Sequence, residues 1–280
     1  MNVDFGPKHL SGLAWLLPLI AAVLTVLLII KKKKGFGEGF DRAVIRYTCY
    51  FMWGWEIVKT IVMVNMDNQM NFGPIGSYPV WMAPFHICSM GLYAYLIIGS
   101  KHPGKLAEWV NPFAYAVLMI VTSIILIIPA SSGILGFVED WSFCKDNILP
   151  FQSWFYHGSL LFVSFYMVLS GFYRPRWSDI YKGATVLAVT AAFSQTLNYV
   201  FDGSGADFMT LRYGRGNPFA FLLEGTPALY YLLLASVSIG GMSLIIGITI
   251  GIRALVAKVR QGKLETAADS FDSEEAVPAN

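Results

Sequence analysis

Long apolar stretches separated by short polar segments make up most of the chain from residue 13 to residue 256. Each stretch has about 18 residues or more, enough for a helix to cross the hydrocarbon core of a bilayer. The pattern predicts seven membrane-spanning helices, at residues 13–30, 47–64, 79–98, 113–130, 151–172, 184–201 and 227–256. The first is predicted to be a retained helix and not a signal peptide, because its apolar region is longer than a signal peptide needs and no small-residue cleavage site precedes Lys31.

Composition agrees with a membrane protein. Hydrophobic residues make up 55% of the chain and charged residues only 14%, compared with about 25% charged residues in a soluble domain. We therefore expect an all-α polytopic membrane protein whose seven-helix transmembrane domain covers residues 1–256. Residues 257–280 are predicted to form a disordered acidic tail, because the chain from Glu265 onward has few large apolar groups.

The distribution of basic residues indicates an orientation. With the amino terminus outside, 15 of the 20 Lys and Arg residues fall in cytoplasmic segments and four fall outside, while Lys59 lies within a span. This bias predicts an outside amino terminus and a cytoplasmic carboxyl terminus. The basic clusters flank the predicted spans and suit anionic lipid headgroups, so no nucleic-acid partner is expected.

The polar residues inside the predicted spans gather at one depth. They are Glu56, Lys59, His86, Cys88, His157, Gln195 and Asn198. With about 1.5 Å of rise per residue, those on the third, fifth and sixth spans lie about 5–14 Å below the outer membrane edge. Lys59 also falls in the outer half, and Glu56 lies nearer the middle. Titratable groups within a membrane are expensive and mark functional sites, so the pattern predicts a polar site in the outer half.

Apart from the two histidines, these residues also have a structural interpretation. Glu56 and Lys59 are spaced i, i+3 and can pair on one helix face. Gln195 and Asn198 can bridge helices through hydrogen bonds. A single thiol such as Cys88 in an apolar helix usually packs as a small hydrophobic group.

Helix geometry favours one partner for the thiol. Residues two apart on an α-helix are separated by about 200° around the axis, so His86 and Cys88 are expected to face away from each other unless Pro84 distorts the turn. If Cys88 is a nucleophile, its base must come from another helix, and His157 is the candidate. Ser89 shares the helix face of His86.

No cofactor or metal is predicted. The three cysteines, Cys49, Cys88 and Cys144, match neither a metal-binding nor a disulfide spacing. A metal or haem held by His86 and His157 is the weakest alternative, because a haem site in a helical bundle commonly uses more histidines than these spans supply.

Several motifs together resemble a known family. They are Pro84-x-His86-x-Cys88-Ser89 in the third span, His157 in the fifth, Asn198-Tyr199 at the end of the sixth, and Pro227 with Tyr230-Tyr231 at the start of the last. Over about residues 42–252 the chain resembles the YwaF-like bacterial integral membrane proteins. That family is similar to a mammalian multi-pass acyltransferase that remodels ether phospholipids and, more distantly, to androgen-induced hydrolases of branched fatty-acid esters.

The resemblance implies a location in the cell membrane, a cysteine that takes an acyl group and a histidine that activates it. The matching positions are Cys88 and His157. Ala83 stands where the family usually has leucine before the proline, a change that leaves the chemistry intact. The fatty-acid-ester hydrolases use a threonine nucleophile, so the match favours the cysteine branch.

These observations predict a lipid acyltransferase or acyl-ester hydrolase that acts on a membrane lipid in the outer-leaflet half of the bilayer. Cys88, His157 and His86 are the predicted catalytic residues. The predicted supporting residues, which bind substrate, orient the histidine, stabilise the oxyanion or set the local field, are Asn198, Gln195, Glu56, Lys59, Ser89, Tyr199 and Tyr230.

The alternative is a non-enzymatic transporter or receptor, in which Glu56, Lys59, His86 and Asn198 line a polar pocket. The scarcity of polar residues in the inner half argues against a continuous path but not against a pocket. The predicted outer loop, residues 202–225, carries Arg212 and Arg215 and is either a phosphate-headgroup site or a hydrated loop.

Overall fold

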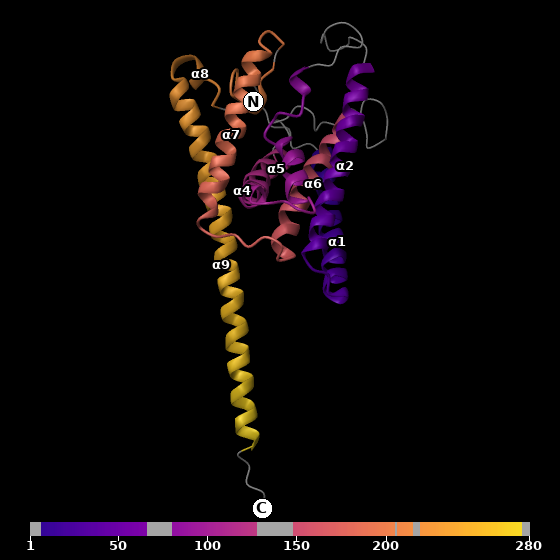
Figure 1. Cartoon of the computed structure of the whole chain (residues 1–280), viewed down its shortest axis with the longest axis vertical. Coiled ribbons are helices and arrows are strands. Elements are labelled where there is room, and N and C mark those ends of the chain that lie inside the picture. The colour runs from indigo at the N-terminus through magenta and orange to yellow at the C-terminus, as the bar shows by residue number, and fades with distance from the viewer. Residues whose placement is uncertain (1–6, 66–79, 128–147, 205, 215–218, 276–280) are drawn as a thin grey trace, which may run out of the picture.

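The computed structural model describes residues 7–65, 80–127, 148–204, 206–214 and 219–275 (Figure 1). Over these residues the prediction of an all-α chain is confirmed, and they contain no β-strand. The elements are α1 (Pro7–Lys34), α2 (Glu38–Asn65), η1 (Val80–Met82), α3 (Met90–Ile98), α4 (Leu106–Pro112), the π-helical turn η2 (Phe113–Val117), α5 (Leu118–Ile127), α6 (Ile148–Leu169), α7 (Asp179–Val200), η5 (Phe208–Thr210), α8 (Leu222–Gly225) and α9 (Pro227–Glu275).

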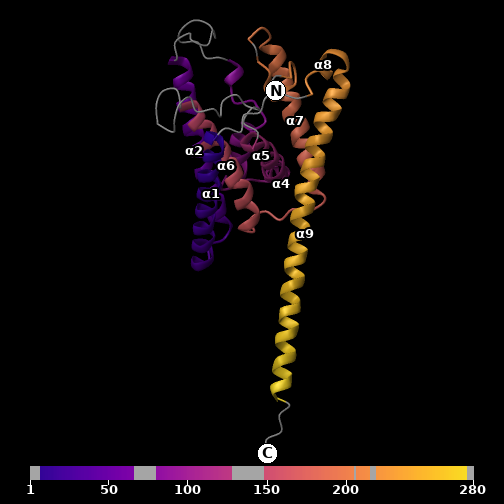
Figure 2. The ribbon, with the colours of Figure 1, turned by 180° about the vertical axis from the view of Figure 1, so that it is seen from behind.

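The continuous segment Leu106–Ile127, formed by α4, η2 and α5, lies at the centre of the molecule. Of its apolar window 56% is buried, compared with 17% for α1 and 11% for α9. Figures 1 and 2 show α1 and α2 at one edge and α9 at the other, with α4 and α5 between them. Within the described ranges, three segments are long and apolar enough to cross a membrane: Gly12–Lys34 of α1, Leu106–Ile127, and Pro227–Gln261 of α9. The count of seven spans and their orientation stay predictions.

The last helix is longer than its apolar run. α9 continues as helix to Glu275 and projects well beyond the other helices (Figure 1). Composition predicts disorder over residues 257–280, yet residues 254–268 are rich in Ala, Lys, Leu and Glu, which are strong helix formers. The boundary at residue 256 and the character of the tail stay predictions.

A buried carboxylate fastens the α1–α2 pair to α6. Asp41 is 2% exposed and receives the ammonium of Lys31 at 2.6 Å and the hydroxyl of Tyr166 at 2.8 Å. Lys31 also donates to the carbonyl of Ser170 at 2.8 Å. A buried charge is tolerated only when it is paired and hydrogen-bonded, and these contacts meet that requirement across three helices.

The expectation of one continuous helix through the third predicted span is wrong for residues 80–98, whereas the span itself stays a prediction. After η1, residues 83–89 form bends and turns, and regular α-helix begins only at Met90. Pro84 lies at the start of this segment, which we call the helix break. Proline has no N–H to donate, and its ring clashes with the carbonyl of the preceding helical turn, so helix cannot run smoothly through it.

Side chains from two other helices satisfy the backbone around the helix break. Lys59 Nζ on α2 donates to the carbonyl of Met82 at 2.9 Å, and Ser194 Oγ on α7 donates to the carbonyl of Phe85 at 2.9 Å. Non-helical backbone at membrane depth is stable only where protein groups replace the missing helical hydrogen bonds. The helix break is therefore a supported feature of the fold.

Candidate functional site

Cys88 lies within the helix break, directly before α3. The N–H of Gly91 donates to the carbonyl of Cys88 at 3.0 Å, and that of Met90 donates to the carbonyl of His86 at 3.1 Å, so the break ends in the first turn of α3. The Cys88 side chain is 7% exposed and belongs to the main apolar core. Since this backbone is not helical, the predicted 200° separation of His86 and Cys88 does not apply.

The ring of His86 contacts an aromatic residue of the loop after α7. Its centroid lies 5.2 Å from that of Phe208 in η5, with the rings tilted by 72°. The ring of Phe85 packs edge-on against the same phenylalanine at 5.4 Å. The helix break thus packs against η5 through the rings of two consecutive residues, Phe85 and His86.

His157 lies on α6, and its hydrogen bonds indicate which ring nitrogen carries the proton. Its Nδ1 lies 2.8 Å from the carbonyl oxygen of Ser153 and 3.2 Å from the Ser153 hydroxyl. A carbonyl oxygen only accepts, so in the neutral ring Nδ1 carries the proton and Nε2 carries the lone pair. The local sequence signal is the i−4 spacing of Ser153, which the analysis of the sequence overlooked. An imidazole held in this way presents Nε2 as a proton acceptor.

The predicted pairing of Glu56 with Lys59 is confirmed. The two side chains form an ion pair on α2, with 5% and 9% of their surfaces exposed respectively. Lys59 also holds the carbonyl of Met82, and it lies within electrostatic range of the His157 ring. The pair therefore connects α2 to the helix break, and its ammonium lies near His157 of α6.

Tyr156 is a residue of the site that the sequence analysis missed. Its ring is 3% exposed and lies 5.7 Å, centroid to centroid, from that of His157. Ser89, Glu56 and Cys88 all lie within interaction range of its hydroxyl. Its only sequence signal is its place beside His157.

We call Glu56, Lys59, Cys88, Tyr156 and His157 the break cluster. The elements that carry them pack together: Tyr95 of α3 donates to a carbonyl of α6 at 3.2 Å, and the thiol of Cys49 on α2 donates to a carbonyl of α3 at 3.2 Å. No hydrogen bond joins Cys88 to His157 in the part of the chain that the structure describes, and the hydrogen bonds of His157 go to Ser153. A direct thiol–imidazole contact stays a prediction.

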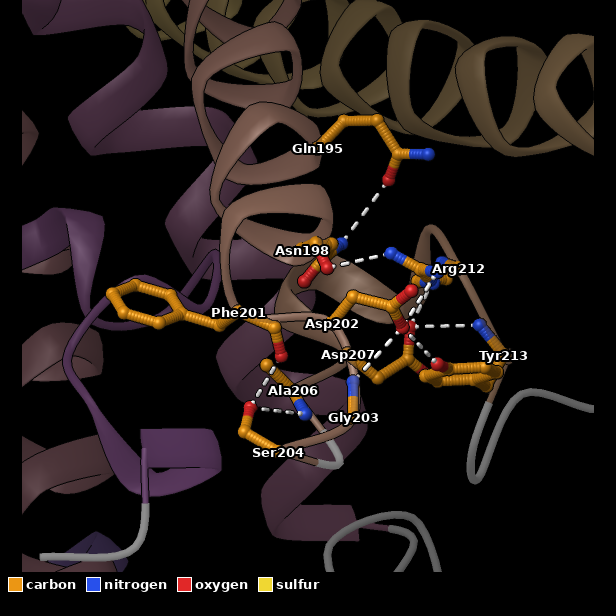
Figure 3. A network of polar contacts seen from close by, with 10 residues as sticks. All are labelled: Gln195, Asn198, Phe201, Asp202, Gly203, Ser204, Ala206, Asp207, Arg212 and Tyr213. Atoms are coloured by element: carbon orange, nitrogen blue, oxygen red, sulfur yellow. Dashed lines mark hydrogen bonds and ion pairs between the residues drawn. The ribbon is translucent and has the colours of Figure 1, made fainter.

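Asn198 is fully engaged in holding the loop after α7 (Figure 3). Its amide nitrogen donates to Phe208 O and to Gln195 Oε1, both at 3.1 Å, and its amide oxygen accepts from Phe208 N at 2.6 Å. The side chain is completely buried. These hydrogen bonds are structural, but they hold the loop to α7 and do not bridge two predicted spans, and they leave no amide hydrogen of Asn198 for an oxyanion.

Arg212 is held by the same loop (Figure 3). It pairs with Asp202 at 2.7 Å, donates to the backbone carbonyl of Asn198 at 2.8 Å, and stacks over Tyr199 and Tyr213 at 4.8 and 5.4 Å. These contacts occupy the guanidinium within the chain. Arg215, the other arginine of the predicted headgroup site, lies outside the described residues.

Asp207 completes this arrangement by accepting from the backbone N–H groups of Arg212 and Tyr213 at 2.8 and 3.0 Å. We call Asn198, Asp202, Asp207, Arg212 and Tyr213 the loop cluster.

The two predicted supporting tyrosines lie at this loop and not at the break cluster. Tyr230, on α9, is fully buried, and its hydroxyl donates to the carbonyl of Thr210 at 2.6 Å. Tyr199 is 63% exposed and lies under Arg212. Ser89, in contrast, lies beside Cys88 in the helix break. Among the residues that the structure describes, no group of three or more His, Cys, Asp or Glu could hold a metal ion.

Comparison with known proteins places the chain in a family. No match was found among curated proteins or among solved structures. The model of the TMEM164 family, in contrast, matches residues 5–247, nearly the whole chain. The chain therefore belongs to the TMEM164 family and is a membrane protein.

Proposed function

We propose that this protein transfers or hydrolyses acyl groups of membrane lipids, with Cys88 as the nucleophile and His157 as the base. The observation that carries the proposal is the break cluster: a buried thiol at an interruption of helical backbone, beside a helix whose histidine keeps Nε2 as a proton acceptor. The resemblance to the YwaF-like proteins, and through them to a lipid acyltransferase, points to the same pair of residues.

The reaction begins when Nε2 of His157 takes the proton of the Cys88 thiol and the thiolate attacks an ester carbonyl of the lipid. A tetrahedral intermediate forms and collapses with cleavage of the carbon–oxygen bond. The leaving alcohol takes the proton from His157, and a thioester remains on Cys88. A second alcohol or water then attacks the thioester while His157 accepts its proton. The carbon–sulfur bond breaks, the new ester or acid departs, and His157 returns the proton to the Cys88 sulfur.

The other predicted residues act by holding this arrangement. The ion pair of Glu56 and Lys59 supports the helix break through the carbonyl of Met82. Asn198 and Gln195 hold the loop whose Phe208 packs on His86. We infer seven spans, an outside amino terminus, a cell-membrane location and a lipid substrate from the apolar runs, the charge bias and the resemblance.

The test is capture of the acyl-enzyme. Protein reconstituted with phospholipid carrying a labelled acyl chain is expected to acquire label that neutral hydroxylamine removes, because thioesters are cleaved under conditions that spare oxygen esters. Cys88→Ala is expected to reduce the label by at least about 100-fold. Cys49→Ala is the matched control: Cys49 is also buried, but its thiol donates to Leu92 O in α3, and labelling should persist.

Equal labelling of the wild type and Cys88→Ala would overturn the proposal. A transporter or receptor would then remain, and loss of lipid binding on substitution of Glu56 or Lys59, with no acyl transfer in any variant, would favour it.

A further inference from the structure

The hydroxyl of Tyr156 is an unused hydrogen-bond donor in the interior. The side chain is 3% exposed, and its hydroxyl oxygen is buried with no hydrogen-bond partner in the described part of the chain. A buried polar group without a partner destabilises a fold by about 1–3 kcal/mol. Phenylalanine would fill the same space without this penalty, so the hydroxyl calls for an explanation.

The hydroxyl of Tyr156 lies near the residues that carry out the proposed reaction. Cys88 and Glu56 lie within its electrostatic range, and Ser89 lies beside it without a hydrogen bond of normal geometry. His157 follows Tyr156 in the chain, with its ring in edge contact at 5.7 Å. Two consecutive residues of α6, about 100° apart around the helix axis, thus supply a proton acceptor and a hydroxyl donor.

A neutral phenol donates its strongest hydrogen bonds to an oxygen that carries negative charge. When the Cys88 thiolate adds to an ester carbonyl, that charge appears on the carbonyl oxygen. The carboxylate of Glu56 is the other anionic group nearby, but it is already paired with Lys59. Among the described residues near this hydroxyl, no unpaired anionic acceptor remains, whereas the reaction itself creates one.

We propose that Tyr156 is a catalytic residue whose hydroxyl donates to the oxyanion of the tetrahedral intermediate formed at Cys88. This inference rests on the proposed function. The side-chain amide of Asn198, which the sequence suggests for the same task, is occupied by Phe208 and Gln195. We therefore assign the hydrogen bond to the oxyanion to Tyr156 and not to Asn198.

The test is the rate of acylation in Tyr156→Phe. This change removes one oxygen and keeps the ring, so we expect the thermal stability to be unchanged or slightly raised. We expect the single-turnover rate of thioester formation to fall by about 100- to 1,000-fold, the usual effect of removing one oxyanion donor. Lipid binding, measured as the lipid concentration that gives half the maximal acylation rate, should change little.

Tyr95→Phe is the matched control. Tyr95 is also fully buried, but its hydroxyl donates to the carbonyl of Leu160 at 3.2 Å. This variant should lose stability and keep its acylation rate per folded molecule. A wild-type acylation rate in Tyr156→Phe, with Cys88→Ala inactive, would overturn the role of Tyr156 alone. A wild-type rate in Cys88→Ala would overturn the proposed function itself.

Discussion

The two polar clusters of this protein differ in how completely they use their hydrogen-bonding groups. In the loop cluster, Asn198 employs both amide hydrogens and its amide oxygen, and Arg212 combines an ion pair, a backbone hydrogen bond and two aromatic contacts. In the break cluster, the hydroxyl of Tyr156 has no partner within the described residues. Within the same residues, the hydrogen bonds of His157 involve Nδ1.

This difference separates two kinds of polar interior. A network whose groups are all engaged stabilises one geometry and leaves nothing with which to bind or transform a ligand. A cluster that keeps a donor and an acceptor unused loses stability in the resting state and gains it when a complementary group forms. We therefore assign a structural role to the loop cluster and chemistry to the break cluster, and the following predictions test that division.

The largest stability effect is expected at the ion pair of the break cluster. Lys59→Met leaves the carboxylate of Glu56 buried without its partner, which should reduce the free energy of unfolding by about 3–5 kcal/mol. The double variant Glu56→Gln/Lys59→Met removes both charges and should recover most of this loss. Reversible unfolding in mixed detergent micelles measures both.

If the double variant is as unstable as the single one, the hydrogen bond from Lys59 to Met82 O, and not the charge pair, stabilises the helix break.

The next largest effect is expected at the centre of the loop cluster. Asn198→Ala leaves the buried N–H and carbonyl of Phe208 without partners, which should destabilise the protein by about 2–3 kcal/mol. Thr196→Ala on the same helix is the control, because its exposed hydroxyl donates to Ala192 O one turn earlier and its loss should matter by less than about 0.5 kcal/mol.

Acylation of Cys88 per folded molecule should be preserved in Asn198→Ala. If Asn198→Ala has the wild-type free energy of unfolding but is no longer acylated, Asn198 takes part in the reaction, and the loop cluster is not purely structural.

Residue spacing predicted the contact made within one helix. The i, i+3 spacing of Glu56 and Lys59 was sufficient to predict their pairing, because an α-helix sets the distance between such residues without help from the rest of the fold. The all-helical class followed in the same way from apolar runs of spanning length.

Contacts between segments were not predictable from spacing. The sequence showed Pro84, but the length of the helix break depends on Lys59 and Ser194, which approach it from α2 and α7. Tyr156 was overlooked because a tyrosine in an apolar run has no special pattern, and only the packing shows that its hydroxyl lacks a partner.

A smaller effect, of opposite sign, is expected where the loop backbone is strained. Thr210 has a φ of 57°, in the left-handed region that a β-branched residue rarely adopts, and its carbonyl is held there by the Tyr230 hydroxyl. Thr210→Gly should relieve this strain and raise the free energy of unfolding by about 1 kcal/mol. Thr196→Gly, in the regular helix α7, should lower it by a similar amount.

If both glycine variants are destabilised, side-chain contacts of Thr210 outweigh the backbone strain, and the loop is held in a conformation that suits it.

The smallest effect is expected in the pH dependence of stability, through Asp202 on the exposed side of the loop cluster. Partial desolvation raises the pKa of Asp202, but the Arg212 guanidinium and the hydrogen bonds from Gly203 and Tyr213 outweigh it, so the pKa is lowered from its usual 3.8. A carboxylate with a lowered folded-state pKa contributes stability that is present above the unfolded value and disappears as the pH falls through the folded value.

The thermal midpoint of the wild type should therefore decline below about pH 4 more steeply than that of Asp202→Asn, which has no titrating group at this position. Added salt should reduce the difference, because this ion pair is open to solvent. Identical profiles would mean that the Asp202–Arg212 pair contributes nothing measurable, and that the buried hydrogen bonds of Asn198 hold the loop by themselves. The contrast between the two clusters would then rest on buried groups alone, where the dielectric is low and a missing partner matters most.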